Sequence, residues 1–278
     1  FYLLFTFDNI TSYILFVSIL AWIHVRGSAS SALVATAVLP KGVLPILAIL
    51  AVFGVWGSAY AVNAGAIAGN RAIIGGLSAQ SSGESREQFL KAISYGAPAM
   101  QEAREHFVQS AVALRGANVP DEEKVAYLRS ASEEMARQIA DAPLNARFPF
   151  FFGALLNTYG QYADAQAALL QARELSPGKQ AIIFELGRNA LAQGKGDEAL
   201  AFFKEAYELA PDFTEARVLY ASTAILLGQD QVADELVEPL IQSGTLDNRI
   251  AGAYAGMKRY GKIVELWEAY LTKNPNDV

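Results

Sequence analysis

The chain has 278 residues, of which 53% are hydrophobic, with a formal net charge of −6 and no cysteine. The lack of cysteine excludes disulfides, Cys-ligated zinc and a thiol nucleophile. The acidic balance leaves no basic surface that would attract nucleic acid, so no nucleic-acid partner is expected.

The charges are distributed unevenly along the chain. Residues 1–68 contain only three Lys, Arg, Asp or Glu side chains, which are Asp8, Arg26 and Lys41. The remaining residues, 69–278, contain 20 of the 22 Lys and Arg and 27 of the 28 Asp and Glu. Two different environments are indicated, a membrane for the first part and water for the second.

Two apolar segments are candidates for transmembrane helices. Residues 10–25 carry no charge and are slightly short for a bilayer crossing, which takes about 20 residues. Residues 43–62 form an uncharged run of the required length, and Pro45 is tolerated near its start, where a helix does not need that N–H. A buried hairpin in a soluble protein is the alternative.

The segment between these two candidates suggests an orientation. Residues 26–42 include Arg26 and Lys41 and no acid, so by the positive-inside tendency this loop lies in the cytoplasm. The expected location is then the inner or cytoplasmic membrane, as a multi-pass protein with a periplasmic or extracellular charged domain. Because Phe1 begins inside an apolar run without an initiator Met, we expect a fragment of a longer protein.

Landmarks of the charged region recur every 34 residues, with one glycine interval of 33. They are Gly160, Gly194, Gly228 and Gly261; Pro143, Pro177 and Pro211; Ala165, Ala199 and Ala233; and Leu169, Phe203 and Val237. This period is typical of antiparallel helix pairs in which Gly forms the turn within a pair and Pro ends the second helix. The pattern, clearest at 159–177 and 193–211, is similar to that of the tetratricopeptide repeat (TPR).

One helix pair exposes an apolar stripe that only the next pair can cover, so such repeats stack into a solenoid. The predicted fold class is therefore all-α, with two transmembrane helices followed by a TPR-type α-solenoid. We assign the membrane region to 1–68, a helical connector with a break at Pro98 to 69–120, and the TPR-like repeats to 121–278.

No group of residues predicts catalysis, a cofactor or a metal site. His24 and His106 are the only histidines, and His106 is expected to have a helix-surface or packing role. Two pairs of adjacent acids are expected to be solvated: Glu122 with Glu123, and Glu133 with Glu134. The chain has no P-loop, dinucleotide fingerprint or nucleophile elbow.

Binding residues are equally difficult to assign. Asn9-Ile10-Thr11 matches a glycosylation sequon but lies beside the expected membrane. Five aromatic residues are candidates for a groove that holds a peptide or sugar: Tyr159, Tyr162, Phe184, Tyr207 and Tyr220. At helical spacing, core packing is the commoner role for such residues.

Two segments carry a resemblance to a membrane-protein family. The opening FYLLFTFDNITSYILFVSILAWI, and SYGAPAMQEAREHFVQSA ahead of the repeats, resemble the C-terminal end of bacterial O-antigen ligase or polymerase-like proteins with TPRs. The resemblance covers the whole chain in architecture but is specific only in FDNITSYILF and YGAPAMQEAREHF.

The resemblance implies a part in cell-surface polysaccharide assembly, with the lipid bilayer and a protein or glycan as partners of the chain. The large loop that contains the family's essential basic residues is not in this sequence, so no catalytic residue is carried over and enzymatic activity is left open. The alternative is a membrane-anchored TPR scaffold with no enzymatic activity.

Overall fold

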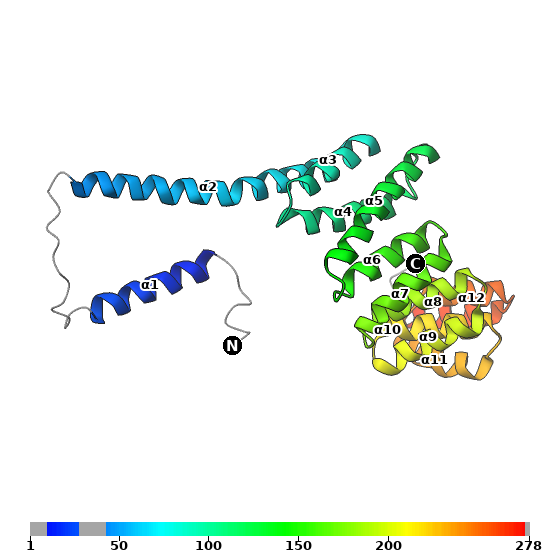
Figure 1. The fold of residues 1–278 in the computed structure, drawn as a ribbon. Coiled ribbons are helices and arrows are strands. Elements are labelled where there is room, and N and C mark those ends of the chain that lie inside the picture. The colour runs from blue at the N-terminus through cyan, green and yellow to red at the C-terminus, as the bar shows by residue number, and fades with distance from the viewer. Residues whose placement is uncertain (1–9, 28–42, 276–278) are drawn as a thin grey trace. The chain divides into compact units, whose positions relative to one another are not determined.

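The computed structural model describes residues 10–27 and 43–275, and every regular element in these ranges is a helix (Figure 1). The all-α class is thus confirmed. The chain divides into two compact units, Phe1–Tyr60 and Ala61–Val278, which are described separately. The predictions for Asn9, and for Lys41 and the other residues at 28–42 of the loop predicted at 26–42, lie outside the described residues.

The first unit contains α1 (Ile10–Gly27) and the first half of α2 (Val43–Ser78). All side chains described in α1, and all from Pro45 to Ala61 in α2, are exposed. They include large apolar groups, such as Trp56 with 73% of its surface accessible. Only one described helix, over Pro45–Ser78, is both long and apolar enough to span a membrane, and α1 is a shorter apolar helix.

The environment of α2 changes along its length. Ala72 and Ile73 are buried in the second unit, and Gly69 lies so close to α4 that an added Cβ would be 2.5 Å from the Cβ of Ala99. The helix thus continues beyond the predicted span at 43–62, and the predicted domain boundary at residue 68 lies inside it. Beyond residue 62 the helix has exposed side chains, such as those of Ile67 and Ile74, as well as buried ones.

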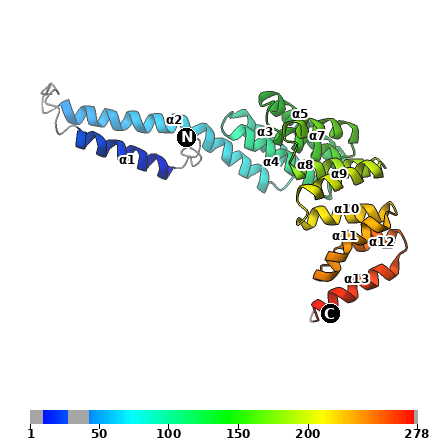
Figure 2. The ribbon, with the colours of Figure 1, turned by 90° about the horizontal axis from the view of Figure 1, so that it is seen from below.

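The second unit continues with a series of helices that follow one another in chain order (Figures 1 and 2). They are α3 (Ser82–Ser94), α4 (Ala99–Leu114), α5 (Asp121–Asp141), α6 (Arg147–Thr158), α7 (Tyr162–Leu175), α8 (Gln180–Ala192), α9 (Gly196–Leu209), α10 (Thr214–Leu226), α11 (Asp230–Ser243), α12 (Asn248–Gly256) and α13 (Tyr260–Lys273). The break predicted at Pro98 separates α3 from α4.

The connector is part of the hydrophobic core. Phe89 of α3 stacks on Phe107 of α4 with ring centroids 5.4 Å apart, and Tyr127 of α5 packs edge-on against Phe107 at 4.9 Å. All three rings are buried. Helices α3, α4 and α5 therefore share one core cluster, in which the connector packs against the first helix of the predicted repeat region.

Helix pairs α6/α7, α8/α9 and α10/α11 repeat one turn geometry. Gly160, Gly194 and Gly228 all adopt left-handed backbone conformations, with φ of +77°, +74° and +68°. Such φ values are unfavourable for residues with a Cβ, which explains the spacing of these glycines. The turns predicted at these three positions are confirmed.

The fourth turn differs from the prediction. Gly261 lies inside α13, and the left-handed residue between α12 and α13 is Lys258, with φ of +57°. Helix α12 has 9 residues, whereas α10 has 13, so the turn comes one helical turn earlier than the repeat period predicts. The sequence masks this shortening because Gly261 happens to lie near the expected position.

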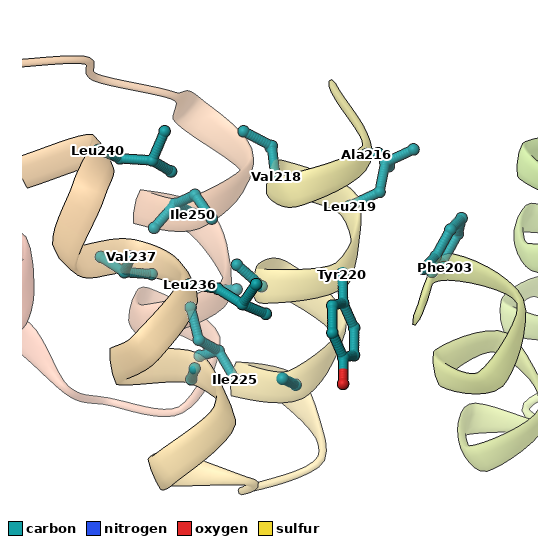
Figure 3. Packing of buried hydrophobic residues seen from close by; sticks show 14 of the residues in the cluster. Phe203, Ala216, Val218, Leu219, Tyr220, Ile225, Leu236, Val237, Leu240 and Ile250 are labelled. Carbon is teal, nitrogen blue, oxygen red and sulfur yellow. The ribbon is translucent and has the colours of Figure 1, made fainter. Parts of the chain in front are cut away.

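Small residues allow the two helices of a pair to approach closely. A Cβ on Gly153 would lie 2.5 Å from Cγ of Leu169, and one on Gly187 would lie 2.5 Å from Cε1 of Phe203. Between pairs, α9, α10, α11 and α12 share a continuous apolar core, in which Phe203, Leu236 and Ile250 are buried (Figure 3). The stacking expected of a solenoid is therefore present.

Candidate partner-binding face of the repeat domain

A pocket of about 430 Å³ lies between the N-terminal ends of α6 and α8. Its walls are formed by Phe150 and Phe151 of α6 and by Ala181 and Ile182 of α8. The two phenylalanines are half-buried and Ile182 is buried, so the pocket is a hollow in the packed surface. A volume of this size accommodates a large side chain and part of its backbone.

Two cations lie at this pocket. The Arg147 guanidinium lies over the Phe151 ring, 5.3 Å from its centroid, and its Nη2 is 2.6 Å from Oε2 of Glu105. Lys179, at the start of α8, also lines the pocket and has no ion-pair partner among the described residues. The pocket therefore combines apolar walls with positive charge, in a region where acidic residues outnumber basic ones.

A polar pocket adjoins the first and shares Arg147 with it. Glu102, Glu105 and His106 of α4 line this second pocket. His106 Nε2 is 3.8 Å from Oε1 of Glu102, beyond hydrogen-bond length, and its side chain is about one-third exposed. The expected helix-surface role of His106 fits this position. The described residues contain no group of three or more His, Cys, Asp or Glu side chains that could hold a metal ion.

A buried charge network joins α4 to α5. Arg104 Nε is 3.1 Å from Oε2 of Glu134, and its Nη1 donates to Gln138 Oε1 at 2.9 Å and to Asp141 Oδ2 at 2.8 Å. Arg137 also donates to Glu134. Because these charges are paired and Arg104 and Glu134 are buried, the network is suited to holding helices together rather than to catalysis.

The expectation for Glu134 was therefore wrong. Glu133 is solvated and pairs with Arg129 on the helix surface, but Glu134 is buried because its side of α5 faces Arg104 on α4. The other predicted acidic pair is on the surface, where Glu122 is exposed and Glu123 accepts a hydrogen bond from Ser82. Adjacency in the sequence did not reveal which member of a pair faces a neighbouring helix.

A ladder of opposite charges joins the first helices of successive repeats. The Glu215 carboxylate of α10 accepts hydrogen bonds from both terminal nitrogens of Arg249 of α12, each at 2.7 Å. Arg188 of α8 lies 3.7 Å from the same carboxylate. The hydrogen bonds from Arg249 lower the pKa of Glu215, and a similar bond lowers the pKa of Asp247. Because these charges pair with one another within the chain, they are less available than the Lys179 ammonium for an ion pair with a partner.

The five candidate aromatics are largely occupied in packing. Phe184 and Tyr220 are buried in the repeat core, and Tyr207 lies against Tyr220 with ring centroids 5.9 Å apart. The Tyr159 hydroxyl donates to the carbonyl of Ala111 at 2.8 Å. The residues that line the pocket between α6 and α8 all belong to the described part of the chain, and none of the five candidate aromatics is among them.

The residues of this pocket were not predicted from the sequence. Phe150 and Phe151 belong to the run FPFFF, which is apolar on all sides of the helix and so gives no indication of which rings remain accessible. Lys179 follows Pro177 by two residues, the position at which a TPR array starts its next helix. The spacing from Pro177 could therefore have predicted that Lys179 lies beside the end of the preceding repeat.

Comparison with known proteins supports the repeat assignment. Residues 190–256 match the family model described as "Tetratricopeptide repeat", which confirms that prediction for this stretch. No curated protein matches the chain.

Among solved structures, PilW, a widely conserved type IV pilus biogenesis factor, is similar over 70% of this chain and 85% of its own, with 16% identity and a TM-score of 0.51. A thermophilic TPR protein of Thermus thermophilus has 15% identity over 61% of this chain and 93% of its own, with a TM-score of 0.42.

An O-GlcNAc transferase of Thermobaculum terrenum has 17% identity over 50% of this chain, with a TM-score of 0.36, and this chain covers only 27% of its length. The likeness to PilW supports the solenoid fold, and at such low identity it concerns the fold alone. None of the matches described here is an O-antigen ligase.

Proposed function

We propose that the repeat domain is a protein-interaction module and that the pocket between α6 and α8 receives a segment of its partner. The observation that supports this function is the partly accessible apolar surface of Phe150 and Phe151 on a TPR-like stack of helices, beside Lys179, which forms no ion pair with the residues that the structure describes. Stacked helical repeats present extended surfaces that bind protein segments.

Site-specific photocrosslinking tests this function. A benzophenone amino acid at Phe150 should give an adduct with a partner, whereas the same group at Val125, an exposed position on α5, should not. Filling the pocket with Ala181→Trp should abolish the adduct from position 150. An adduct that is unaffected by this substitution would place the partner elsewhere on the domain.

We further propose that the exposed part of α2 anchors the chain in a membrane. Residues 45–61 are apolar and exposed, and a helix of this length rises about 26 Å at 1.5 Å per residue, close to the roughly 30 Å core of a bilayer. The Arg26 guanidinium lies 5.1 Å from the Trp22 ring centroid at the end of α1, as suits a membrane interface.

The proposed location of the repeat domain is periplasmic or extracellular, and the lack of cysteine gives a direct test. A single cysteine at Val125 in intact cells should react with a membrane-impermeant maleimide, whereas one at Gly27, beside the proposed cytoplasmic loop, should not. If the cysteine at position 125 is labelled only after the cells are lysed, the orientation is the opposite of the one proposed.

The resemblance to O-antigen ligases remains a prediction from the sequence. It is compatible with the proposed anchor and interaction module, and so is a scaffold without enzymatic activity. Loss of surface polysaccharide on deletion of the gene, restored only by a chain with an intact pocket, would favour the ligase or polymerase role. Unchanged polysaccharide would favour the scaffold.

A further inference from the structure

The pocket between α6 and α8 has a chemistry that narrows the class of partner. Phe150 packs against a cluster formed by α7 and α8, and Phe151 packs against the cluster to which α2, α3, α4, α5 and α6 contribute. Their ring centroids are 5.7 Å apart and the rings are tilted by 41°. The two rings thus lie at the junction of two hydrophobic clusters, which fixes the apolar walls in place.

The charge at the pocket is positive. Arg147 and Lys179 line it, and no carboxylate does among the described residues that form its wall. Glu105 pairs with Arg147 from the side of the adjoining polar pocket. That ion pair is made through one terminal nitrogen of a guanidinium with five N–H donors, and the Lys179 ammonium, which has three, forms no ion pair within the described ranges.

The positive charge of this pocket lies in a domain that is acidic overall. Residues 69–278 contain 27 acidic and 20 basic side chains, and the repeats neutralise many of their cations internally. Arg173 pairs with Glu205 at 2.8 Å and Arg249 with Glu215 at 2.7 Å, each joining neighbouring repeats. Lys179 has no such pair among the described residues. A cation without an internal partner beside an apolar hollow favours an anionic ligand with an apolar part.

We propose that the pocket binds an acidic segment of a partner protein, in which one aromatic or large aliphatic side chain enters between Phe150 and Ile182 and a neighbouring carboxylate pairs with Lys179. This inference rests on the proposed function and specifies the partner of the same site. Arg147 contributes mainly by covering the Phe151 ring, and its free N–H groups are available to the carbonyl groups of the segment.

Three fluorescein-labelled peptides test the proposal against the full chain in detergent. The first, GSDDFLDSG, has both features; the second replaces its Asp residues by Asn, and the third replaces Phe and Leu by Ala. We expect fluorescence anisotropy to show binding of the first peptide about tenfold tighter than either of the others at low salt. The advantage over the Asn peptide should shrink at high salt, because exposed charges are screened.

Matched variants identify the cation. Lys179→Gln should reduce the preference for the acidic peptide and Lys179→Glu should remove it, whereas Lys91→Glu on α3 should leave it unchanged. Both lysines are exposed, and Lys91 is likewise outside any ion pair in the described part of the chain. Circular dichroism spectra that match the wild type would show that the variants fold.

The outcomes separate this inference from the function on which it rests. Equal affinity for the acidic and Asn peptides, or a preference that Lys179→Glu leaves intact, overturns the acidic class of partner. If the adduct at position 150 forms but the first peptide does not compete with it, the interaction module stands and the inference fails. The labelled peptide can also be displaced by a competitor, either the same peptide without label or soluble dihexanoylphosphatidylglycerol. If the lipid displaces it at lower concentrations than the unlabelled peptide does, the inference is overturned in favour of a lipid ligand.

Discussion

Gly187 of α8 lies directly against the ring of Phe203 of α9. A Cβ at position 187 would be 2.5 Å from Cε1 and 2.6 Å from Cζ of that ring, which is fully buried. The two helices of this repeat can therefore approach only because position 187 lacks a side chain. The same relation holds between Gly153 and Leu169 in the preceding repeat.

Gly187→Ala should therefore destabilise the repeat domain. Replacing Gly by Ala in a helix normally stabilises it by about 1 kcal/mol, but overpacking in a dense core costs about 1–3 kcal/mol. We expect a net loss in urea unfolding followed by circular dichroism. The control is Gly252→Ala in α12, where an added Cβ meets nothing within 4 Å and the helix gain should appear alone. Equal stabilisation by both substitutions would contradict the close approach.

Lys258 provides a prediction of the opposite sign. It adopts the left-handed conformation that glycine adopts in the other three turns, with its N–H bonded to the carbonyl of Ala255 at 2.9 Å. A residue with a Cβ loses about 1 kcal/mol in this conformation. Lys258→Gly should therefore stabilise the domain by up to about 1 kcal/mol, measured as a higher urea midpoint.

The reciprocal variant provides the control for the fourth turn. Gly228→Lys, at the equivalent place in the preceding turn, should destabilise the domain by a similar amount, because its φ is +68°. Replacing Gly261 by Ala within α13 should be neutral or stabilising, since an added Cβ there meets nothing within 4 Å. If Gly261→Ala instead destabilises the domain, the result would support a turn at Gly261, where the repeat period predicted it.

The turns of the repeats and the pocket between α6 and α8 also show what the sequence could and could not predict. The 34-residue period located the first three turns, because a left-handed turn favours glycine and small residues are required where helices cross. It misplaced the fourth, because α12 is shorter and Lys258 tolerates the strained conformation. The pocket between α6 and α8 was missed for another reason: whether Phe150 or Phe148 is accessible depends on the packing of α6 against helices distant in the sequence.

The buried pair of Arg104 and Glu134 should be sensitive to the loss of one partner. Arg104→Ala leaves the buried Glu134 carboxylate with Arg137 as its remaining cationic partner, and removing one member of a buried ion pair typically costs about 3–5 kcal/mol. Arg129→Ala, which removes a solvated ion pair on the same helix as Glu134, should cost less than about 1 kcal/mol. Urea unfolding of the two variants measures both values.

A double variant tests the physical reason for that sensitivity. Arg104→Met with Glu134→Leu removes both charges and keeps apolar volume, so it should recover much of the stability lost in Arg104→Ala. The recovery should be incomplete, because Gln138 and Asp141 also lose their partner in Arg104. A double variant less stable than Arg104→Ala would show that the charges stabilise the fold beyond satisfying each other.

The charge ladder predicts a contribution to stability that depends on pH. Hydrogen bonds from Arg249 hold the pKa of Glu215 below its ordinary value, and partial burial opposes this only in part. A lowered pKa in the folded state means that the contribution is fully present above the unfolded pKa of about 4.3 and is lost as pH falls through the folded value. Stability should therefore decrease from about pH 5 downward.

Glu215→Gln should flatten part of this acid dependence, by no more than about 1 kcal/mol because the pair is partly solvated. Urea midpoints measured between about pH 3 and pH 6 compare the slopes of the variant and the wild type. The control is Glu268→Gln on α13, an exposed carboxylate that forms no ion pair among the described residues. The Glu215 variant should show the shallower slope, since it alone removes the carboxylate that joins α8, α10 and α12. Parallel slopes in the two variants would mean that Arg249 does not hold Glu215 ionised in solution.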